Sequence, residues 1–173
     1  YRIEKAGISG IVCTTQDDTA KKMKEAVERT GGDIKLWTVQ REFDGFSNLT
    51  EMLETASDEF ERVKTCVTDP MVTYFTSGTT GYPKAVIHDF SYPLANIVTA
   101  KYWHRAEDGG LHFTVAETGW AKASWGKIYG QWLLESAVMV YDFDNFDPRQ
   151  LTTVINKYGV TTFCAPPTVY RYL

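Results

Sequence analysis

The chain has 173 residues, of which 43% are hydrophobic and 14% aromatic, so it is long enough and apolar enough to form a domain with its own core. Its formal net charge is -4, and without a basic block or stripe it does not resemble a nucleic-acid binder. The longest apolar run, residues 137–141, is much shorter than the about 20 apolar residues of a transmembrane helix. The composition therefore predicts a globular chain without a membrane span.

The first forty residues alternate between helix-like and strand-like segments. Residues 1–7 are typical of the end of a helix, and residues 8–14 contain a short buried strand. Residues 17–19 are expected to cap a helix that Gly31 and Gly32 end, and residues 34–39 are expected to form the next strand. A strand, a helix and a strand in this order predict a parallel pair in an α/β layer.

Turn and capping residues divide the rest of the chain. Asn48 and Glu51 form a capping-box-like helix start, and residues 57–68 are expected to be a solvated connection, with a short helix left open. Further strands are expected at residues 71–75, 85–87, 111–115, 137–141 and 160–164, and further helices from residues 91–93, around 128–134, from Asp147-Pro148 to Gly159, and from 170. The pattern predicts an α/β fold with mixed, largely parallel sheets flanked by helices.

The stretch from Thr76 to Lys84 is suited to binding phosphate. Six small residues in a row, four with hydroxyls and two glycines, are followed by Tyr, Pro and Lys. Glycines allow the backbone to approach a ligand closely, and the N–H groups of such a loop form a concave donor surface, to which hydroxyls and an ammonium add donors and charge. We predict a phosphate-binding loop, with an ordinary hairpin loop as the alternative.

This predicted loop differs from the two common nucleotide-binding loops. A Walker loop needs Gly-Lys-Ser/Thr leading directly into a helix, whereas Lys84 follows Pro83 and precedes Ala-Val-Ile. A dinucleotide-binding fingerprint needs G-x-G-x-x-G, and Gly78 and Gly81 lack that spacing. Both flanking segments are strand-like, so the loop is expected to join two strands.

Three segments, in order, resemble the signatures of one enzyme family. Thr-Ser-Gly-Thr-Thr-Gly-Tyr-Pro-Lys at 76–84 is similar to the phosphate loop of the adenylate-forming enzymes, namely acyl- and aryl-CoA synthetases, luciferases and peptide synthetase adenylation domains. Glu117-Thr-Gly-Trp120 resembles a segment in which the family usually has Asp where this chain has Glu117. Residues 160–173 resemble the next motif, in the form typical of AMP-forming medium-chain acyl-CoA synthetases.

The resemblance implies an acid–thiol ligase. Such an enzyme uses ATP and Mg²⁺ to convert a medium-chain or related carboxylic acid into an acyl-adenylate and pyrophosphate, and then transfers the acyl group to coenzyme A. It implies an ATP-phosphate site at Thr76, Ser77, Gly78, Thr79, Thr80, Gly81 and Lys84. It also implies an acyl-substrate pocket at Trp120, Trp125, Gly126 and Tyr129, for which aromatic core packing is the alternative.

The resemblance further implies that residues 1–173 are part of one N-terminal adenylation domain. Residues 1–69 would form a first α/β portion and a connection, and residues 70–173 the phosphate-loop and acyl-site portion. The family's adenine and Mg²⁺ motifs and the catalytic lysine of its C-terminal domain have no counterpart in the chain. We therefore expect no catalytic residue and no metal ligand among these residues, and no activity from them alone.

The expected partners are the small-molecule acid, ATP and coenzyme A, with self-association left open. The expected location is the cytoplasm, or the mitochondrial matrix in a eukaryote. Another adenylate-forming ligase, acting on acetate or an aryl acid, and a nucleotide-binding module without turnover are the alternative functions. The identity of the acid stays open because Trp125 beside Gly126 would shorten or redirect the pocket.

The cysteines and histidines add little from sequence alone. Cys13, Cys66 and Cys164 lack metal-ligand spacing and are predicted to be buried free thiols. His88 is predicted to make a structural hydrogen bond, and His104 and His112 have no partner pattern and stay unassigned.

Overall fold

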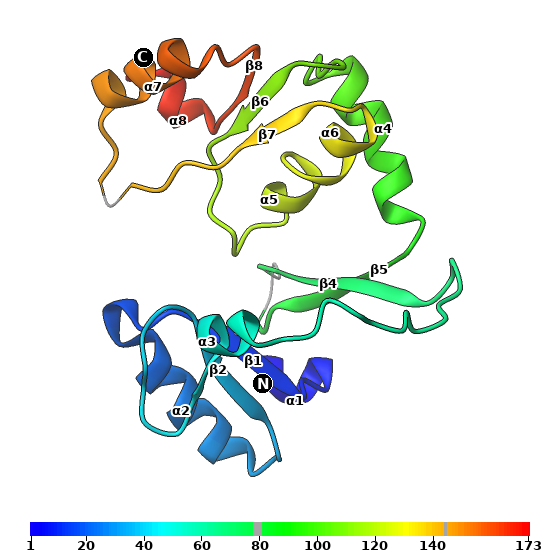
Figure 1. Ribbon diagram of the computed structural model, residues 1–173, viewed down its shortest axis with the longest axis vertical. Helices are drawn as coiled ribbons and strands as arrows, with labels where there is room; N and C mark the ends of the chain where they lie inside the picture. Colours follow the sequence, from blue (N-terminus) through cyan, green and yellow to red (C-terminus); the bar gives the residue numbers. More distant parts are fainter. Residues whose placement is uncertain (78–80, 144) are drawn as a thin grey trace. The chain divides into compact units, whose positions relative to one another are not determined.

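A computed structural model describes residues 1–77, 81–143 and 145–173 (Figure 1). The chain forms two compact units, the first from Tyr1–Thr65 and Phe75–Ala85 and the second from Cys66–Tyr74 and Val86–Leu173. Each unit combines parallel strands with helices, which confirms the predicted α/β class. None of the described helices is long and apolar enough to cross a membrane.

The first unit is built on a parallel three-stranded sheet. β1 (Gly10–Cys13) pairs with β2 (Lys35–Thr38), and β2 pairs in turn with β3 (Ser47–Asn48). The predicted strand, helix, strand unit is confirmed, whereas the short β3 was not predicted. The helices of this unit are α1 (Arg2–Ala6), the 3₁₀ helix η1 (Gln16–Asp18), α2 (Thr19–Thr30) and α3 (Leu49–Glu54).

Local signals place most helix ends of this unit correctly. Gly31 ends α2 with φ of 66°, a left-handed conformation that glycine adopts without steric cost. The Asn48 side chain accepts the Thr50 N–H at 3.1 Å and donates to Glu51 at 2.9 Å, so α3 begins as predicted. The capping prediction for Asp18 is wrong, because Asp18 itself has φ of 59° and its side chain makes no cap hydrogen bond.

Of two other local predictions, one is confirmed and one needs correction. Residues 57–68 form the predicted exposed connection, without the short helix that was left open. The three cysteines are free, but only Cys164 is buried, whereas Cys13 is half-buried and Cys66 exposed. Cys66 lies in a continuously exposed stretch, residues 51–68, where no core forms.

The predicted loop joins two paired strands. β4 (Pro70–Thr76) and β5 (Lys84–Asp89) form a two-stranded sheet. The predicted strand, loop, strand setting is therefore confirmed.

The second unit is built around β6 (Leu111–Thr114), which lies between β7 (Ala137–Met139) and β8 (Thr162–Cys164) and is parallel to both. Successive strand residues point to opposite faces, so Phe113 faces one side while His112 and Thr114 face the other. The helices of this unit are α4 (Tyr92–Tyr102), α5 (Lys122–Trp125), α6 (Tyr129–Leu133), α7 (Pro148–Tyr158) and α8 (Pro167–Tyr170).

The apolar core lies on the Phe113 face of this sheet, where α7 and α8 pack (Figure 1). Phe113 and Leu151 are 1% and 2% exposed, and Ala165 and Val169 complete the cluster. Asp147 caps α7 as predicted, since its carboxylate accepts the Arg149 N–H at 2.8 Å. The last helix begins at Pro167, before the expected position, because proline is well suited to the first turn of a helix.

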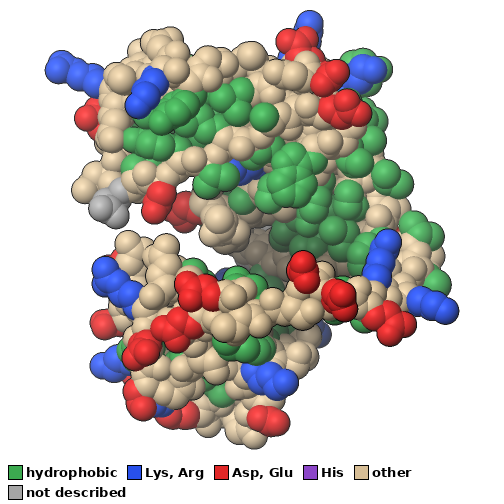
Figure 2. All heavy atoms as spheres, in the orientation of Figure 1, with side chains coloured by type: hydrophobic (Ala, Val, Ile, Leu, Met, Phe, Trp, Pro, Cys, Tyr) green, Lys and Arg blue, Asp and Glu red, His purple; other side chains and the backbone are tan. Residues whose placement is uncertain are grey.

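On the opposite face α4 packs tightly against α6. The buried residues of α4 are Asn96 and Ala100, whereas Leu94, Val98 and Tyr102 are exposed. A Cβ added to Gly130 would lie 2.4 Å from the Asn96 carbonyl oxygen and 2.6 Å from the Ala100 Cβ, so only glycine fits at this crossing. Hydrophobic side chains are correspondingly prominent on the visible face of the second unit (Figure 2).

We expect Gly130→Ala to lower the free energy of unfolding of the full-length protein by about 1–3 kcal/mol, because the added methyl overpacks a backbone contact. Gly32→Ala is the matched control, since a Cβ there meets only Ile34 at ordinary contact distance, 3.5 Å. Urea unfolding measures both. Equal stability of the two variants would contradict the close packing of α4 and α6.

Candidate functional site

The ends of the two strands that flank the predicted phosphate loop lie close together. Thr76 ends β4 and Lys84 begins β5, and the Thr76 hydroxyl donates a long hydrogen bond of 3.5 Å to the Lys84 carbonyl. Thr76, Ser77, Gly81 and Lys84 are exposed. Gly78, Thr79 and Thr80 of the predicted set lie outside the described residues. The described residues thus present two hydroxyls and one ammonium at the ends of the strands.

Gly81 has a conformational reason to be glycine. Its φ is 84°, in the left-handed region, and a Cβ there would meet no atom within 4 Å. Space is therefore not the constraint at this position. The backbone turn itself requires a residue that tolerates positive φ.

The residues that follow Gly81 are held by the start of the chain. The rings of Tyr1 and Tyr82 are stacked, with centroids 4.6 Å apart, and the Tyr1 hydroxyl donates to the Pro83 carbonyl at 3.0 Å. The Arg2 guanidinium lies 5.6 Å from the centre of the Phe75 ring. Both strand ends at the loop therefore have packing partners within the first unit.

Three of the four predicted acyl-pocket residues lie in one short run of the second unit. Trp125 ends α5, Gly126 follows it, and Tyr129 begins α6. Trp120 precedes α5 and is 69% exposed. These residues are neighbours because they are close in sequence. Their role in acid binding stays a prediction.

An aromatic cluster anchors this run to β4. Tyr74 is hydrogen-bonded to the Ser124 hydroxyl, which donates to the Ala121 carbonyl at 2.8 Å, so Tyr74 is the donor to Ser124. The Tyr74 ring packs edge-on to His88, and His88 stacks on Tyr92 with ring centroids 4.1 Å apart. The contact that the structure shows for His88 is therefore stacking, which fits a structural role.

The phenols of Tyr92 and Tyr129 stay neutral. Burial raises the pKa of Tyr92, and the neighbouring Tyr74 raises it further. Burial also raises the pKa of Tyr129, whose ring packs edge-on to Tyr92 at 6.0 Å. Neutral phenols in this position are hydrogen-bond donors and cannot act as bases near pH 7.

A second anchor holds the carbonyl of Gly126. The Thr114 hydroxyl donates to this oxygen at 2.5 Å and the Gln131 amide at 3.3 Å, while His112 Nε2 lies 3.0 Å from it. His112 also contacts the Thr162 hydroxyl through Nδ1 at 2.7 Å. Strand β6, strand β8 and helix α6 therefore each contribute a side chain to one polar network.

The donor pattern fixes the protonation of both histidines. Because the Thr114 hydroxyl hydrogen is used on Gly126, its oxygen accepts from His112 Nε2–H at 2.8 Å, and Nδ1 accepts from Thr162. The Gly126 carbonyl only accepts hydrogen bonds, so the Gln131 side chain must face it with its amide nitrogen. The same nitrogen donates to His104 Nδ1 at 3.0 Å. Among the residues the structure describes, His104 Nε2 and Gln131 Oε1 are buried without a partner.

Burial keeps both rings uncharged. It lowers the pKa of His104 to about 4, with smaller contributions from His112 and Lys122, and it lowers the pKa of His112 despite the Gly126 carbonyl. Sequence reasoning left both histidines unassigned. The alternation in β6 does place His112 and Thr114 on one face, but no sequence signal identifies Gly126 or Gln131 as their partners.

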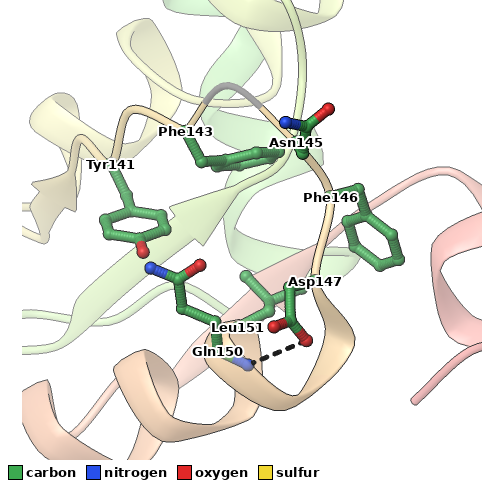
Figure 3. A pocket seen from close by; sticks show the side chains of 7 residues that line it. All are labelled: Tyr141, Phe143, Asn145, Phe146, Asp147, Gln150 and Leu151. Atoms are coloured by element: carbon green, nitrogen blue, oxygen red, sulfur yellow. Dashed lines mark hydrogen bonds between the residues drawn. The ribbon is translucent and has the colours of Figure 1, made fainter.

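The hollow drawn in Figure 3 lies elsewhere. It is lined by Tyr141, Phe143, Asn145, Phe146, Asp147, Gln150 and Leu151. Its carboxylate is already engaged as the cap of α7, and the Tyr141 ring packs edge-on to Phe113 of the core. None of the predicted site residues lines it, so we assign it no role in the reaction.

Comparison with solved structures identifies the fold. An acyl-CoA synthetase of Brucella canis superposes with a TM-score of 0.84 at 22% identity, covering 99% of this chain and 31% of that protein. A luciferase-like enzyme of Zophobas morio superposes with a TM-score of 0.78 at 19% identity, covering 99% of this chain and 39% of that protein. These likenesses show that the chain has the fold of one part of adenylate-forming enzymes.

Sequence comparison gives the family. The chain belongs to the family of AMP-binding enzymes, whose model matches residues 1–173. It is 34% identical to the mitochondrial acyl-coenzyme A synthetase ACSM3 of Homo sapiens over 100% of this chain, and 36% identical to ACSM4 of Mus musculus over 80% of it. The chain spans about 30% of the length of ACSM3.

We expect acidification from pH 6.5 to about 4 to destabilise the protein through His104. Its folded pKa of about 4 lies below the unfolded value of 6.5, so in this window the unfolded chain binds a proton that the folded chain does not. Stability due to this group is complete above pH 6.5 and is lost as the pH falls to 4.

Urea midpoints of the full-length protein across this pH range test the effect. His104→Asn should reduce the slope of stability against pH between 4 and 6.5. Ser136→Ala is the control, because it removes a buried hydrogen bond to Gly110 without removing a titrating group. An unchanged slope in His104→Asn would refute the role of this histidine.

Proposed function

We propose that the chain is part of an AMP-forming acyl-CoA synthetase. The enzyme activates a medium-chain or related carboxylic acid with ATP, releases pyrophosphate, and transfers the acyl group to coenzyme A. The observation that carries this proposal is the family match along all 173 residues, and it is supported by the sequence between β4 and β5, which resembles the phosphate loop of adenylate-forming enzymes. Relatives named as acyl-coenzyme A synthetases support it.

The loop residues hold and orient the ATP phosphates. Both reacting partners are anionic, so donors and cations must bring them together and stabilise the charge that develops on the leaving group. Thr76, Ser77, Thr79 and Thr80 supply hydroxyl donors and Lys84 supplies a positive charge. The glycines at 78 and 81 are residue types that let a backbone approach its ligand. An oxygen of the substrate carboxylate bonds to the α-phosphorus, and the bond from that phosphorus to the pyrophosphate oxygen breaks. No enzyme nucleophile takes part.

The acyl group is assigned to the run that contains Trp120, Trp125, Gly126 and Tyr129. Trp125 and Tyr129 offer apolar ring surface, and Gly126 offers a position without a side chain. The two anchors described above hold this run from β4 and from β6. We propose that residues 1–69 form a supporting α/β portion and residues 70–173 the part that contacts ATP phosphates and acid.

The remaining groups of the reaction are proposed to bind outside these residues. Mg²⁺ prefers carboxylate and phosphate oxygens, and the described residues contain no cluster of three metal-binding side chains. We assign no step through the ion to this chain. Coenzyme A and the adenine ring are likewise assigned to other parts of the enzyme, and both the compartment and self-association stay predictions.

Exchange of labelled pyrophosphate into ATP, measured on the full-length protein with a panel of acids, tests the proposed function. Exchange that requires a medium-chain acid, followed by acyl-CoA formation, supports it. Preference for acetate or an aryl acid would replace it with another ligase of the same family. A protein that binds ATP and an acyl-AMP analogue equally well, without exchange, would be a nucleotide-binding module.

We expect Lys84→Ala to lower acid-dependent pyrophosphate release roughly a hundredfold, because a cation that stabilises the transition state is lost. Folding should change little, since Lys84 is exposed. Lys21→Ala, which removes an exposed lysine of α2, is the matched control and should keep full activity. Unchanged release by Lys84→Ala would overturn the assignment of this loop to the phosphates.

A further inference from the structure

Polar side chains of β6 and α6 have no part in the proposed chemistry. They nevertheless converge on one atom of the proposed acid-binding run, the carbonyl oxygen of Gly126. Thr114 and Gln131 donate to the Gly126 carbonyl oxygen at 2.5 and 3.3 Å, and His112 lies 3.0 Å from it. These three side chains are no more than 1% exposed. Buried hydrogen bonds hold their partners at particular distances and directions, which apolar contacts do not.

The helix that ends at this carbonyl cannot hold its own conformation. α5 has only four residues, and a helix this short does not persist without tertiary contacts. If the segment moved, the buried Gly126 carbonyl would lose its donors and remain without partners, which is costly. The network on β6 and α6 therefore determines where the backbone at residues 125 and 126 lies.

The same network also reaches the ring of Trp125. His104 and Trp103 lie nearly parallel to this ring, with interplanar angles of 16° and 15° and centroids 6.0 and 5.9 Å away. The Gln131 amide that donates to Gly126 also donates to His104 Nδ1 at 3.0 Å. Gln131 thus constrains Trp125 twice, through the adjoining backbone and through the ring stacked on it.

The geometry points to Gln131, Thr114 and His112 as positioning residues that fix Trp125 and Gly126 and so determine which acids the enzyme accepts. This inference rests on the proposed function. A fixed tryptophan presents a rigid wall to the acid, so releasing it should weaken use of the preferred acid and admit longer or bulkier ones. None of the hydrogen bonds of these three residues involves a described residue of the phosphate loop, so use of ATP should be spared.

The test compares full-length variants in pyrophosphate exchange with a series of acids of increasing length. In Thr114→Val combined with Gln131→Met, kcat/KM for the preferred acid should fall about tenfold, the order expected when one or two hydrogen bonds are lost. The preference should move toward longer acids, and the KM for ATP should change less than about twofold. Thr114→Val alone, which is nearly isosteric, should give a smaller shift in the same direction.

Ser136→Ala is the matched control. The residue is 3% exposed, and its hydroxyl donates to the Gly110 carbonyl at 3.2 Å, so the side chain that is removed makes no hydrogen bond to Gly126, Gln131 or His104. It should leave the acid series unchanged. A double variant with an unchanged acid series, or with equal losses toward acid and ATP, would overturn the inference.

Hydrogen–deuterium exchange separates this inference from the proposed function. Peptides covering residues 120–130 should exchange faster in the double variant than in the wild type or in Ser136→Ala, whether or not the protein is an acyl-CoA synthetase. A wild type without acid-dependent pyrophosphate exchange overturns the proposed function. Unchanged protection of residues 120–130 overturns the positioning role even if the enzyme is active.

Discussion

The carbonyl oxygen of Gly126 connects the central strand of the second unit to the helices on one of its faces. Because side chains alternate along β6, this strand places Phe113 in an apolar core with α7 and α8, and His112 and Thr114 against α5 and α6. The two faces are stabilised by different interactions. The apolar face requires volume, whereas the polar face requires particular atoms at particular distances.

Two neighbouring residues of α6 make this arrangement compatible with close packing. Gly130 lets α4 approach at a distance that any Cβ would prevent, and Gln131 reaches back to Gly126 and His104. The helix is thus fixed by steric contact on one side and by hydrogen bonds on another. Tyr74 supplies a further bond to Ser124, so the segment between β6 and α6 is constrained from both ends.

Much of the fold could be predicted because its signals are local. Gly31 and Gly159 end helices in the left-handed conformation, and Asp147 caps α7, as glycine and aspartate at such positions indicate. The phosphate loop, whose role stays a prediction, rests on a nine-residue pattern and on its flanking strands, and the structure confirms that these strands pair. Asp18 does not cap α2 with its side chain because the backbone turns into the left-handed region at Asp17 and Asp18, with φ of 49° and 59°.

The polar network could not be predicted because its members are distant in sequence. His112 and Thr162 are 50 positions apart, as are Tyr74 and Ser124, so only the pairing of strands brings them together. Hydrophobic periodicity also says little about α4. Its packed side carries Asn96 and Ala100 because the neighbouring backbone comes too close for larger side chains.

Helix α4 exposes its large hydrophobic side chains, and this has a practical consequence for handling the protein. Leu94, Val98 and Tyr102 are 57%, 62% and 70% exposed, so this side of α4 is a hydrophobic surface in contact with water. Prepared alone, residues 1–173 would tend to self-associate or precipitate at the concentrations that crystallisation and nuclear magnetic resonance need. Replacing those three side chains by glutamate or lysine would improve solubility without touching the packed side of the helix.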